Sequence, residues 1–192
     1  MTGIIILAAG SSSRLGKPKQ NLVFEGQTLL QRAVNIALSS ACRPVIVVLG
    51  ANVETIGPTI KDKPVQIVFN EDWSEGMASS IAAGMKQLQQ MKTVPDSVIL
   101  MLCDQPFVSD TILNQLIQLR SENTIVACVY NETTGVPALF DKSYFDELLL
   151  LSGPEGAKKL LLKHKEAVKV VPFDLGGIDI DTTGDFENLT MP

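Results

Sequence analysis

A loop rich in hydroxyl groups and positive charge follows the first apolar stretch of the chain. The run Gly3–Leu7 is succeeded by AAGSSSRLGKPKQ, in which Arg14, Lys17 and Lys19 lie close together. Small residues let an anion approach backbone amides, an arginine can grip phosphate oxygens through two hydrogen bonds, and a lysine supplies a mobile point charge. We therefore predict an anion-binding loop, with a solvated basic turn as the alternative.

This loop matches neither of two common phosphate-binding patterns. A Walker A loop has four residues between its glycines, whereas Gly10 and Gly16 enclose five and Pro18 follows Lys17. The dinucleotide fingerprint requires a glycine where Ser12 stands. A phosphate site at this loop must therefore be of another kind.

Carboxylates in two further segments could hold a divalent cation. Asp104 directly follows the apolar run Val98–Cys103, and a hard oxygen ligand there suits Mg²⁺, although a turn or capping role is the alternative. In the segment 177–182, Asp179 and Asp181 share one face if the backbone is extended, and an exposed polar strand end is the alternative. If Asp181 approaches Asp104, the pair could bind Mg²⁺ between them.

The stretch NEDWSEGMASSIAAGM is expected to open a helix. Gly76, Ser79 and Ser80 then lie near the helix N-terminus, where free amides and hydroxyl groups can contact a nucleotide. The alternative is that these residues only cap the helix and pack.

Other kinds of site are poorly supported by the composition. Cys42, Cys103 and Cys128 are too widely spaced for a disulfide framework or a zinc site. His164 is the one histidine of the chain, which argues against a Ser-His-Asp triad, and we expect it to be an ordinary surface residue.

The overall composition predicts a single globular domain. Of 192 residues, 45% are hydrophobic and 19% are charged, and the net charge of −5 argues against a broad nucleic-acid surface. The longest apolar runs are too short to span a bilayer, and no secretory signal is recognisable. We expect a cytoplasmic protein with no membrane or nucleic-acid partner.

Apolar runs rich in Val and Ile alternate with helical patterns along nearly the whole chain. The expected strands are Gly3–Leu7, Pro44–Leu49, Val65–Phe69, Val98–Cys103, Thr124–Val129, Val136–Phe140 and Val168–Pro172. The expected helices are Leu29–Ser40, Glu54–Ile60, Met77–Met91, Asp110–Arg120, Lys142–Leu151 and Glu155–His164, with Thr28 and Ser109 as N-caps. This alternation predicts an α/β fold: a doubly wound, mostly parallel sheet in a three-layer α/β/α sandwich.

Ligands of such folds bind beyond the carboxyl ends of the strands. The polar segments Ala8–Gln20, Asn70–Ser80 and Asp104–Pro106 each follow an expected strand directly. We therefore expect them to meet at one edge of the sheet.

Four motifs together resemble the signature of the MobA-like nucleotidyltransferases. They are L-A-A-G-x-S-x-R-L-G-x-P-K (Leu7–Lys19), N-x-x-W-x-E-G-M-x-S-S-I-x-A-G-M (Asn70–Met85), L-C-D-Q-P (Leu102–Pro106) and D-I-D-T (Asp179–Thr182). Their order is that of the family, the resemblance covers nearly the whole chain, and it is nearest to the molybdenum cofactor cytidylyltransferase branch.

The resemblance implies a Rossmann-like nucleotidyltransferase domain over residues 1–192, with the nucleotide bound by the N-terminal half and the acceptor by the C-terminal half. It implies Mg²⁺-dependent transfer of CMP from CTP to the phosphate of molybdopterin cofactor, with release of pyrophosphate. A molybdoenzyme could then receive the product.

The resemblance also implies roles for individual residues. Arg14 and Lys19 would neutralise the triphosphate and, with Asp104, form the catalytic group. Asp104 and Asp181 would bind the metal, with Asp179 as a further candidate. The remaining nucleotide contacts would come from Leu7, Ala8, Ala9, Gly10, Ser12, Ser79 and Ser80.

Two departures from the family pattern concern the acceptor. Val136 stands in G-V-P where relatives often have His, and Pro154 stands where they usually have Asp; both are expected in the acceptor half. A third departure is Thr183–Asp185, which replaces the common P-x-D after D-I-D-T and is expected to affect only a helix start.

Three functional readings remain open. L-A-A-G favours CTP, because the methyl group of Ala9 would crowd a purine. The alternatives are transfer from GTP or to another phosphorylated small molecule, and a carrier or insertion chaperone for the cofactor that performs no transfer.

Overall fold

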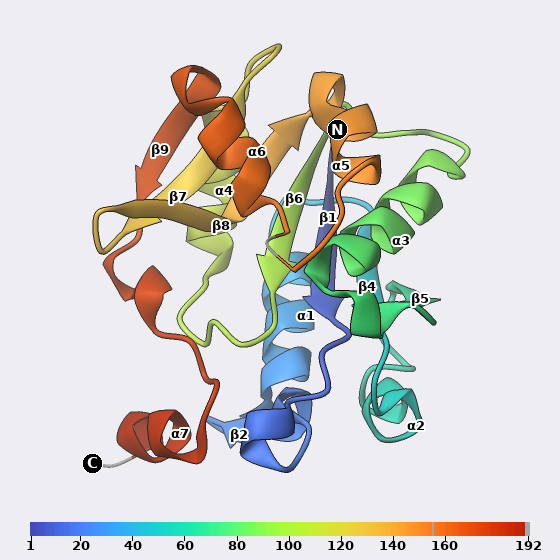
Figure 1. Ribbon diagram of the computed structural model, residues 1–192, viewed down its shortest axis with the longest axis vertical. Helices are drawn as coiled ribbons and strands as arrows, with labels where there is room; N and C mark the ends of the chain where they lie inside the picture. The colour runs from blue at the N-terminus through green and yellow to red at the C-terminus, as the bar shows by residue number, and fades with distance from the viewer. Residues whose placement is uncertain (155, 191–192) are drawn as a thin grey trace.

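A seven-stranded sheet runs through the part of the chain that the structure describes, residues 1–154 and 156–190 (Figure 1). In this computed structural model the strand order is β5-β4-β1-β6-β8-β7-β9. The strands are β1 (Thr2–Ala8), β4 (Val45–Leu49), β5 (Gln66–Phe69), β6 (Ser97–Leu102), β7 (Ile125–Tyr130), β8 (Thr133–Asp141) and β9 (Val168–Pro172). All seven correspond to expected strands, with ends shifted by a few residues.

The sheet is mostly parallel, as predicted, and β8 is its one reversed strand among the described residues. It pairs antiparallel with both β6 and β7, whereas the other pairs are parallel. The reversal follows from the tight turn between β7 and β8, where Asn131 and Glu132 have φ values of 46° and 59°. Two residues with positive φ fit the short turns that join adjacent antiparallel strands.

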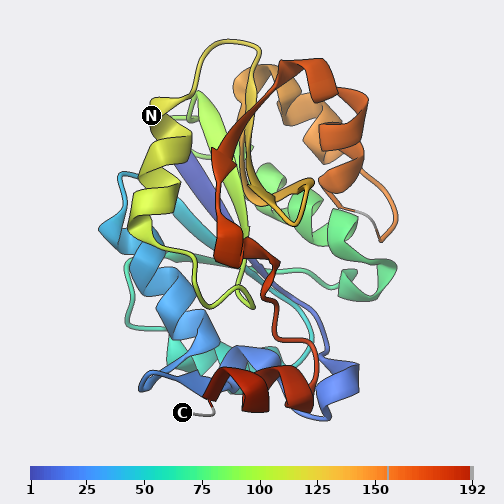
Figure 2. The same ribbon diagram turned by 90° about the vertical axis from the view of Figure 1, so that its left-hand side faces the viewer.

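Helices cover both faces of the sheet and complete the predicted three layers (Figure 2). They are α1 (Leu29–Ser39), α2 (Val53–Ile56), α3 (Met77–Gln89), α4 (Asp110–Gln118), α5 (Phe145–Leu149), α6 (Lys158–Lys163) and α7 (Thr183–Thr190). Helices α1 and α4 pack on one face, and α3, α5 and α6 pack on the other. None of the described helices is both long enough and apolar enough to cross a membrane.

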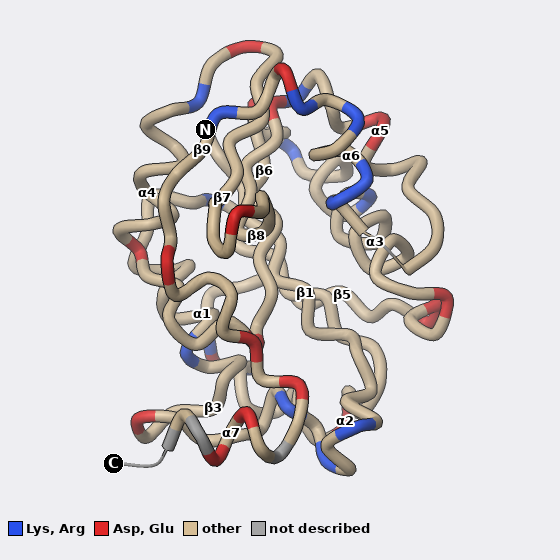
Figure 3. Tube along the Cα trace, turned by 60° about the vertical axis from the view of Figure 1, so that its left-hand side comes forward, with Lys and Arg blue, Asp and Glu red and all other residues tan. Residues whose placement is uncertain are grey.

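The C-terminal segment returns to the first loop of the chain (Figure 3). Ile180 is fully buried in a small cluster with Leu15, Leu22, Phe24 and Leu29. The segment that contains Asp179 and Asp181 belongs to no strand; it is irregular chain between a 3-10 turn at Asp174–Gly177 and α7. Its position beside the first loop is therefore fixed by burial of Ile180, by the hydrogen bond from the Ile180 amide to the Asp104 carbonyl and by the ion pairs of Asp181, not by sheet pairing.

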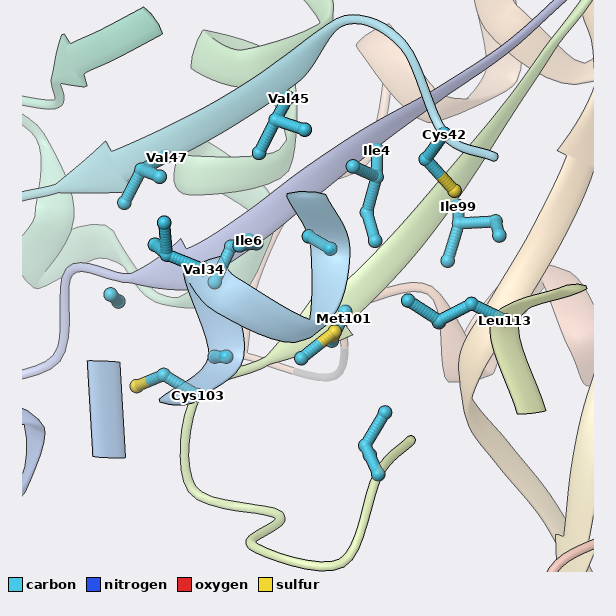
Figure 4. Packing of buried hydrophobic residues seen from close by; sticks show 14 of the residues in the cluster. Ile4, Ile6, Val34, Cys42, Val45, Val47, Ile99, Met101, Cys103 and Leu113 are labelled. Carbon is cyan, nitrogen blue, oxygen red and sulfur yellow. The ribbon is translucent and has the colours of Figure 1, made fainter. Parts of the chain in front are cut away.

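The core explains why the central strands read as continuous apolar runs. Along β1, Ile4 and Ile6 belong to the cluster under α1, whereas Ile5 and Leu7 belong to the cluster under α3. Figure 4 shows the first of these clusters, where Val34 of α1 lies over Ile6. Because side chains of a strand alternate between faces, a strand covered on both sides must be apolar at every position.

Both predicted N-caps are confirmed. The Thr28 hydroxyl accepts a hydrogen bond from the amide of Gln31, whose side chain in turn accepts one from the amide of Thr28. The Ser109 hydroxyl accepts from the amide of Ile112 at the start of α4. These bonds satisfy amides that the first helical turn leaves without partners.

Three helix predictions were too long. The expected helix Glu54–Ile60 is the single turn α2 followed by a 3-10 turn at Gly57–Thr59, because Pro58 lacks an amide hydrogen and disfavours helix before it. The region 142–151 divides into a 3-10 turn and α5. Helix α6 begins at Lys158, and Glu155, where that prediction began, lies outside the described residues.

Candidate active site

The three polar segments that follow strands meet in one cleft of about 400 Å³. The cleft lies at the carboxyl ends of β1 and β6 and at the N-terminus of α3. Its walls are Leu7, Ala8, Ala9, Gly10, Ser11, Lys19, Gln20, Trp73, Ser74, Gly76, Met77, Ser80, Leu102, Cys103, Asp104 and Pro154. The predicted convergence of these segments at the sheet edge is therefore confirmed as geometry.

Gln20 holds the first loop in shape. Its side chain is fully buried, and its Nε2 donates hydrogen bonds of 2.9 Å to the carbonyl oxygens of both Ala8 and Gly10. The Ser12 hydroxyl accepts from the amide of Lys19 at 3.0 Å and donates to Gln20 Oε1 at 3.4 Å. Ser12, expected to touch the nucleotide, is not among the cleft-lining residues and here ties the loop to itself.

Lys19 bridges two carboxylates that are far apart in the sequence. Its Nζ donates to Asp104 Oδ2 and, at 2.9 Å, to Asp181 Oδ1. The Lys19 and Asp104 side chains are 18% and 10% exposed. Burial disfavours the charged ammonium, but Asp104 and then Asp181 outweigh it and raise the pKa of Lys19 above its ordinary value. Lys19 therefore carries a positive charge on the cleft wall at neutral pH.

Arg14 lies outside the cleft and pairs with Asp181. Its Nη2 lies 2.7 Å from Asp181 Oδ2, its side chain is 68% exposed, and it is not among the cleft-lining residues. Burial opposes ionisation of Asp181, but Lys19 and Arg14 together hold the pKa of this carboxyl below its usual range. One carboxylate of the C-terminal segment thus engages two of the three cations of the first loop, Arg14 and Lys19.

The carboxylates of the cleft provide a partial fit for a divalent cation. Asp104 Oδ1 is buried and has no hydrogen-bond partner among the described residues, which leaves an oxygen lone pair free to coordinate a metal. Partial burial of the Asp179 carboxyl, together with the charges of Asp104 and Asp181, raises the pKa of Asp179 to about 6. Within residues 1–154 and 156–190, no three His, Cys, Asp or Glu side chains are grouped as metal ligands. The cation between Asp104 and Asp181 is instead the ammonium of Lys19.

The two predicted serines of α3 differ in their surroundings. Asn70 is buried, and its Nδ2 donates to the hydroxyls of Ser79 at 2.9 Å and Ser80 at 3.0 Å. Ser80 lines the cleft, whereas the Ser79 hydroxyl lies within hydrogen-bond distance of the carbonyls of Asp72 and Gly76. Ser80 is placed to meet a ligand, and Ser79 holds the turn before the helix.

The loop with Pro154 forms part of the wall of this cleft. Gly76 has a φ of 109°, and a Cβ there would lie 3.0 Å from Pro154 Cα and 3.1 Å from the carbonyl oxygen of Gly153. The Ala78 amide donates to that same carbonyl. The close approach explains why glycine stands at position 76 and places the departure at Pro154 on the wall of the first cleft.

A second cavity of about 260 Å³ adjoins the cleft, with Leu7, Met77 and Leu102 shared between them. Its other walls are Ile81, Leu100, Tyr130, Thr133, Thr134, Gly135, Val136, Ala157, Lys158 and Leu161. The departure at Val136 therefore lies in this second cavity. The Val136 carbonyl is fixed by Nε2 of Gln105, which donates to it at 3.1 Å and to the Gly176 carbonyl at 2.8 Å.

Sequence reasoning missed the residues that support this site. Gln20, Asn70 and Gln105 are all buried polar side chains that hold neighbouring segments through hydrogen bonds. Each comes directly after, or one loop after, an apolar strand. The signal that could have indicated them is a polar residue shortly after an apolar strand. A side chain buried there against the sheet edge needs hydrogen-bond partners, which the neighbouring segments supply.

Comparison with known proteins identifies the family of the chain. The family model for the MobA-like NTP transferase domain matches residues 4–168. Nicotine blue oxidoreductase of Paenarthrobacter nicotinovorans is 31% identical over 95% of this chain and 92% of its own length. The purine catabolism protein PucB of Bacillus subtilis is 30% identical over 95% of this chain and 93% of its own length. Molybdenum cofactor cytidylyltransferase of Escherichia coli is 26% identical over 95% of this chain and 92% of its own length.

Solved structures share the fold over almost the full chain. Rv0371c from Mycobacterium tuberculosis superposes with a TM-score of 0.84 at 28% identity, covering 98% of this chain and 96% of that one. The same protein is known in a complex with manganese, with a TM-score of 0.81 at 27% identity over 98% of this chain and 96% of that one. A nucleotidyl transferase from Methanothermobacter gives a TM-score of 0.84 at 19% identity and covers 98% of this chain and 95% of that one. At this identity the likeness shows a shared fold only.

Proposed function

Because the chain belongs to the MobA-like NTP transferase family and is a nucleotidyltransferase, we propose that it transfers CMP from CTP to the phosphate of molybdopterin cofactor. One observation carries the proposal. At the cleft, a cation of the first loop, Lys19, meets the carboxylates Asp104 and Asp181. The name of the Escherichia coli relative supports the choice of nucleotide and acceptor.

The cytosine base and ribose would lie along the end of β1, against Leu7, Ala8, Ala9 and Gly10. Ala9 is 5% exposed and lines the cleft. A Cβ added at Gly50 would lie 2.9 Å from the Ala9 Cβ, so the methyl group of Ala9 packs closely against Gly50. A rigid methyl group at this wall supports a pyrimidine over a purine.

The triphosphate would lie against the first loop, where Lys19 and Arg14 would neutralise it. Lys19 already faces the cleft. Arg14 is exposed and its pair with Asp181 is at the surface, so its side chain can rotate towards a bound phosphate at small cost. Ser80 would add a hydroxyl contact, with Ser12 and Ser79 supporting the loop and the helix start from behind.

Asp104 and Asp181, with Asp179 nearby, would hold Mg²⁺ through carboxylate oxygens. When bound, the ion supplies charge neutralisation for the reacting phosphates. The Asp104 oxygen that lacks a partner is the observation that supports this role. Asp181 can join it once Lys19 and Arg14 turn to the triphosphate.

The reaction needs no protein nucleophile. An oxygen of the acceptor phosphate attacks the α-phosphorus of CTP, the bond from that phosphorus to the bridging oxygen breaks, and pyrophosphate leaves. Such transfers depend on positioning and on stabilising negative charge, which Lys19 and Arg14 provide. Cys103 lines the cleft, but burial, followed by the Asp104 charge, raises its pKa to about 12, so it stays protonated at neutral pH.

Release of pyrophosphate from CTP in the presence of molybdopterin cofactor and Mg²⁺ tests this function, with the product identified by its mass. We expect turnover in the wild type, at least a hundredfold loss in Lys19→Met, and wild-type turnover in Lys17→Met. Lys17 is the matched control because it is an exposed lysine of the same loop that does not line the cleft.

Other outcomes of this assay would replace the proposal. Product formed from GTP but not from CTP would make the chain a guanylyltransferase. Pyrophosphate release with a different phosphorylated acceptor would change the substrate. Tight binding of the cofactor with no pyrophosphate release would indicate a carrier or insertion chaperone.

A further inference from the structure

The two ends of the sheet differ in how they are protected (Figure 1). Strand β9 lies at one end and carries Lys169 and Pro172, whereas β5 lies at the other end with Gln66–Phe69, which contains neither lysine nor proline. Proline has no amide hydrogen, and a lysine on an edge strand discourages pairing with a further strand. The edge of β9 is therefore blunted against pairing, and the edge of β5 is not.

The outer edge of β5 presents backbone groups that can pair. The amide of Asn70 donates to the Leu49 carbonyl of β4 at 2.8 Å. Because the backbone groups of successive strand residues point to opposite sides, those of Val68 also point to β4, and those of Ile67 and Phe69 point away from it. Among the described residues, no strand pairs with β5 on that outer side. Ile67 and Phe69 thus offer amides and carbonyls to a further strand.

The side chains of Ile67 and Phe69 continue an apolar face beyond that edge. In the sheet they lie beside Val47 and Leu49, which are fully buried in the cluster under α1. Ile67 and Phe69 themselves are 43% and 51% exposed. The apolar face of the sheet therefore reaches solvent at β5, where a further strand would cover it.

We propose that β5 pairs antiparallel with β5 of a second copy of this chain about a two-fold axis. A two-fold contact is self-complementary, and two copies of one edge strand satisfy it by antiparallel pairing. With Val68 on the axis, Ile67 lies opposite Phe69 of the other copy, and each such pair exchanges both backbone hydrogen bonds. Their side chains then share one face, in the aromatic and β-branched pairing that stabilises neighbouring strands. This inference does not depend on the proposed nucleotidyl transfer.

Charges at the two ends of β5 favour a second copy as the partner. Lys61 and Lys63 precede the strand and leave that end positive despite Asp62 between them, and Glu71 and Asp72 follow the strand. In the antiparallel arrangement the basic end of each copy lies beside the acidic end of the other. Attraction therefore acts at both ends of the pairing, whereas a parallel arrangement would bring like charges together.

Sedimentation velocity of the full chain tests the proposal. β5 has four residues, and an edge this short favours a dimer that dissociates on dilution. From about 1 µM to about 1 mM protein, we expect the sedimentation coefficient to rise from the monomer value to the dimer value. A chain that stays monomeric throughout would overturn the proposal and leave the edge to a strand of another protein.

A matched pair of variants assigns the dimer to this edge. Ile67→Lys should raise the Kd of the dimer at least tenfold, because it places a charge from each copy among the paired apolar side chains. Val170→Lys is the control and should leave the Kd unchanged, since Val170 is 48% exposed on the opposite edge strand. Both side chains are exposed, so we expect both variants to keep the wild-type Tm. Equal effects of the two variants on the Kd would contradict the assignment.

A mixing experiment tests the charge pairing. Lys61→Glu/Lys63→Glu makes both ends of β5 acidic, and Glu71→Lys/Asp72→Lys makes both ends basic. Each variant alone should dimerise at least tenfold more weakly than the wild type, and an equimolar mixture of the two should recover the dimer, because unlike ends then meet. Wild-type dimerisation of either variant alone, or a mixture that recovers nothing, would overturn the antiparallel arrangement.

Discussion

Lys19 contributes to both the stability of the protein and its proposed chemistry. With Lys19 in place, Asp104 and Asp181 share one cation; Lys19 and Asp104 are largely removed from water, whereas Asp181 is 37% exposed. Removing one partner of a buried ion pair leaves the other charge uncompensated, which costs far more than loss of an exposed pair. The same residue that would neutralise a triphosphate thus also compensates the carboxylates of the site.

We predict that Lys19→Met lowers the free energy of unfolding by about 3 kcal/mol, because Asp104 is left buried without its partner. Arg14→Met should cost at most about 1 kcal/mol, since that pair is exposed. Urea denaturation measures both values. The double variant Lys19→Met/Asp104→Asn should recover part of the loss, and equal effects of the two single variants would contradict the described burial.

Ala9 is the residue on which the nucleotide preference depends. We predict that Ala9→Gly raises the affinity for GTP relative to CTP roughly tenfold, because one methyl group in a pocket changes discrimination by about 1–3 kcal/mol. Calorimetric titration of both nucleotides with Mg²⁺ gives the ratio. An unchanged ratio would show that the methyl group does not face the base.

The buried thiols should be chemically inert in the folded protein. Burial raises the pKa values of Cys103 and Cys128 to about 12 and also raises that of Cys42. At pH 8 all three are therefore protonated, and only a thiolate reacts readily. We predict no labelling by iodoacetamide in native buffer and three labels in guanidinium chloride, read by mass spectrometry. Rapid native labelling of Cys103 would mean that the cleft opens around it.

At the scale of elements, the fit of α3 against the sheet determines where the cleft wall lies. Gly84 faces β1 and β4 so closely that a Cβ there would lie 2.7 Å from Ile5 Cγ2 and 3.1 Å from Val48 Cγ2. Both contacts are with branched side chains inside the core, which cannot swing aside. The helix N-terminus that carries Ser80 depends on this close packing.

We predict that Gly84→Ala destabilises the protein by about 1–3 kcal/mol through overpacking. The sign is informative, because alanine in a helix interior is otherwise more favourable than glycine by about 1 kcal/mol. Thermal or urea denaturation measures the change. A variant as stable as the wild type would show that α3 can move away from β1 without cost.

At the scale of the whole molecule, the sheet and its helices could be predicted because their signals are local. The apolar run Gly3–Leu7 became β1 with one more residue at each end, and the capping residues Thr28 and Ser109 mark α1 and α4. The rule that ligands bind at the carboxyl ends of strands then placed the polar segments of the cleft together.

What could not be predicted depends on long-range contacts or on very short elements. Lys19 and Asp181 are 162 positions apart. Burial of Ile180 beside Leu15 and the hydrogen bond from the Ile180 amide to the Asp104 carbonyl bring them together. The hairpin of β2 (Val23–Phe24) and β3 (Gln27–Thr28) has two residues in each strand, too few for a periodic pattern. For α7, only a helix start at Thr183–Asp185 was expected, and not the extent of the helix. The roles assigned to the site residues stay predictions.

The central claim is that the cleft binds a nucleoside triphosphate together with a divalent cation. Thermal unfolding with CTP, GTP, ATP or UTP, each with and without Mg²⁺, tests it most directly. A ligand at a hundred times its Kd adds about 2.7 kcal/mol, which raises the Tm of a chain of this size by roughly 5–10 °C. We predict that CTP gives such a shift when Mg²⁺ is present and not when it is absent, and that Asp104→Asn loses the shift. No shift with any nucleotide in the presence of Mg²⁺ would contradict the account.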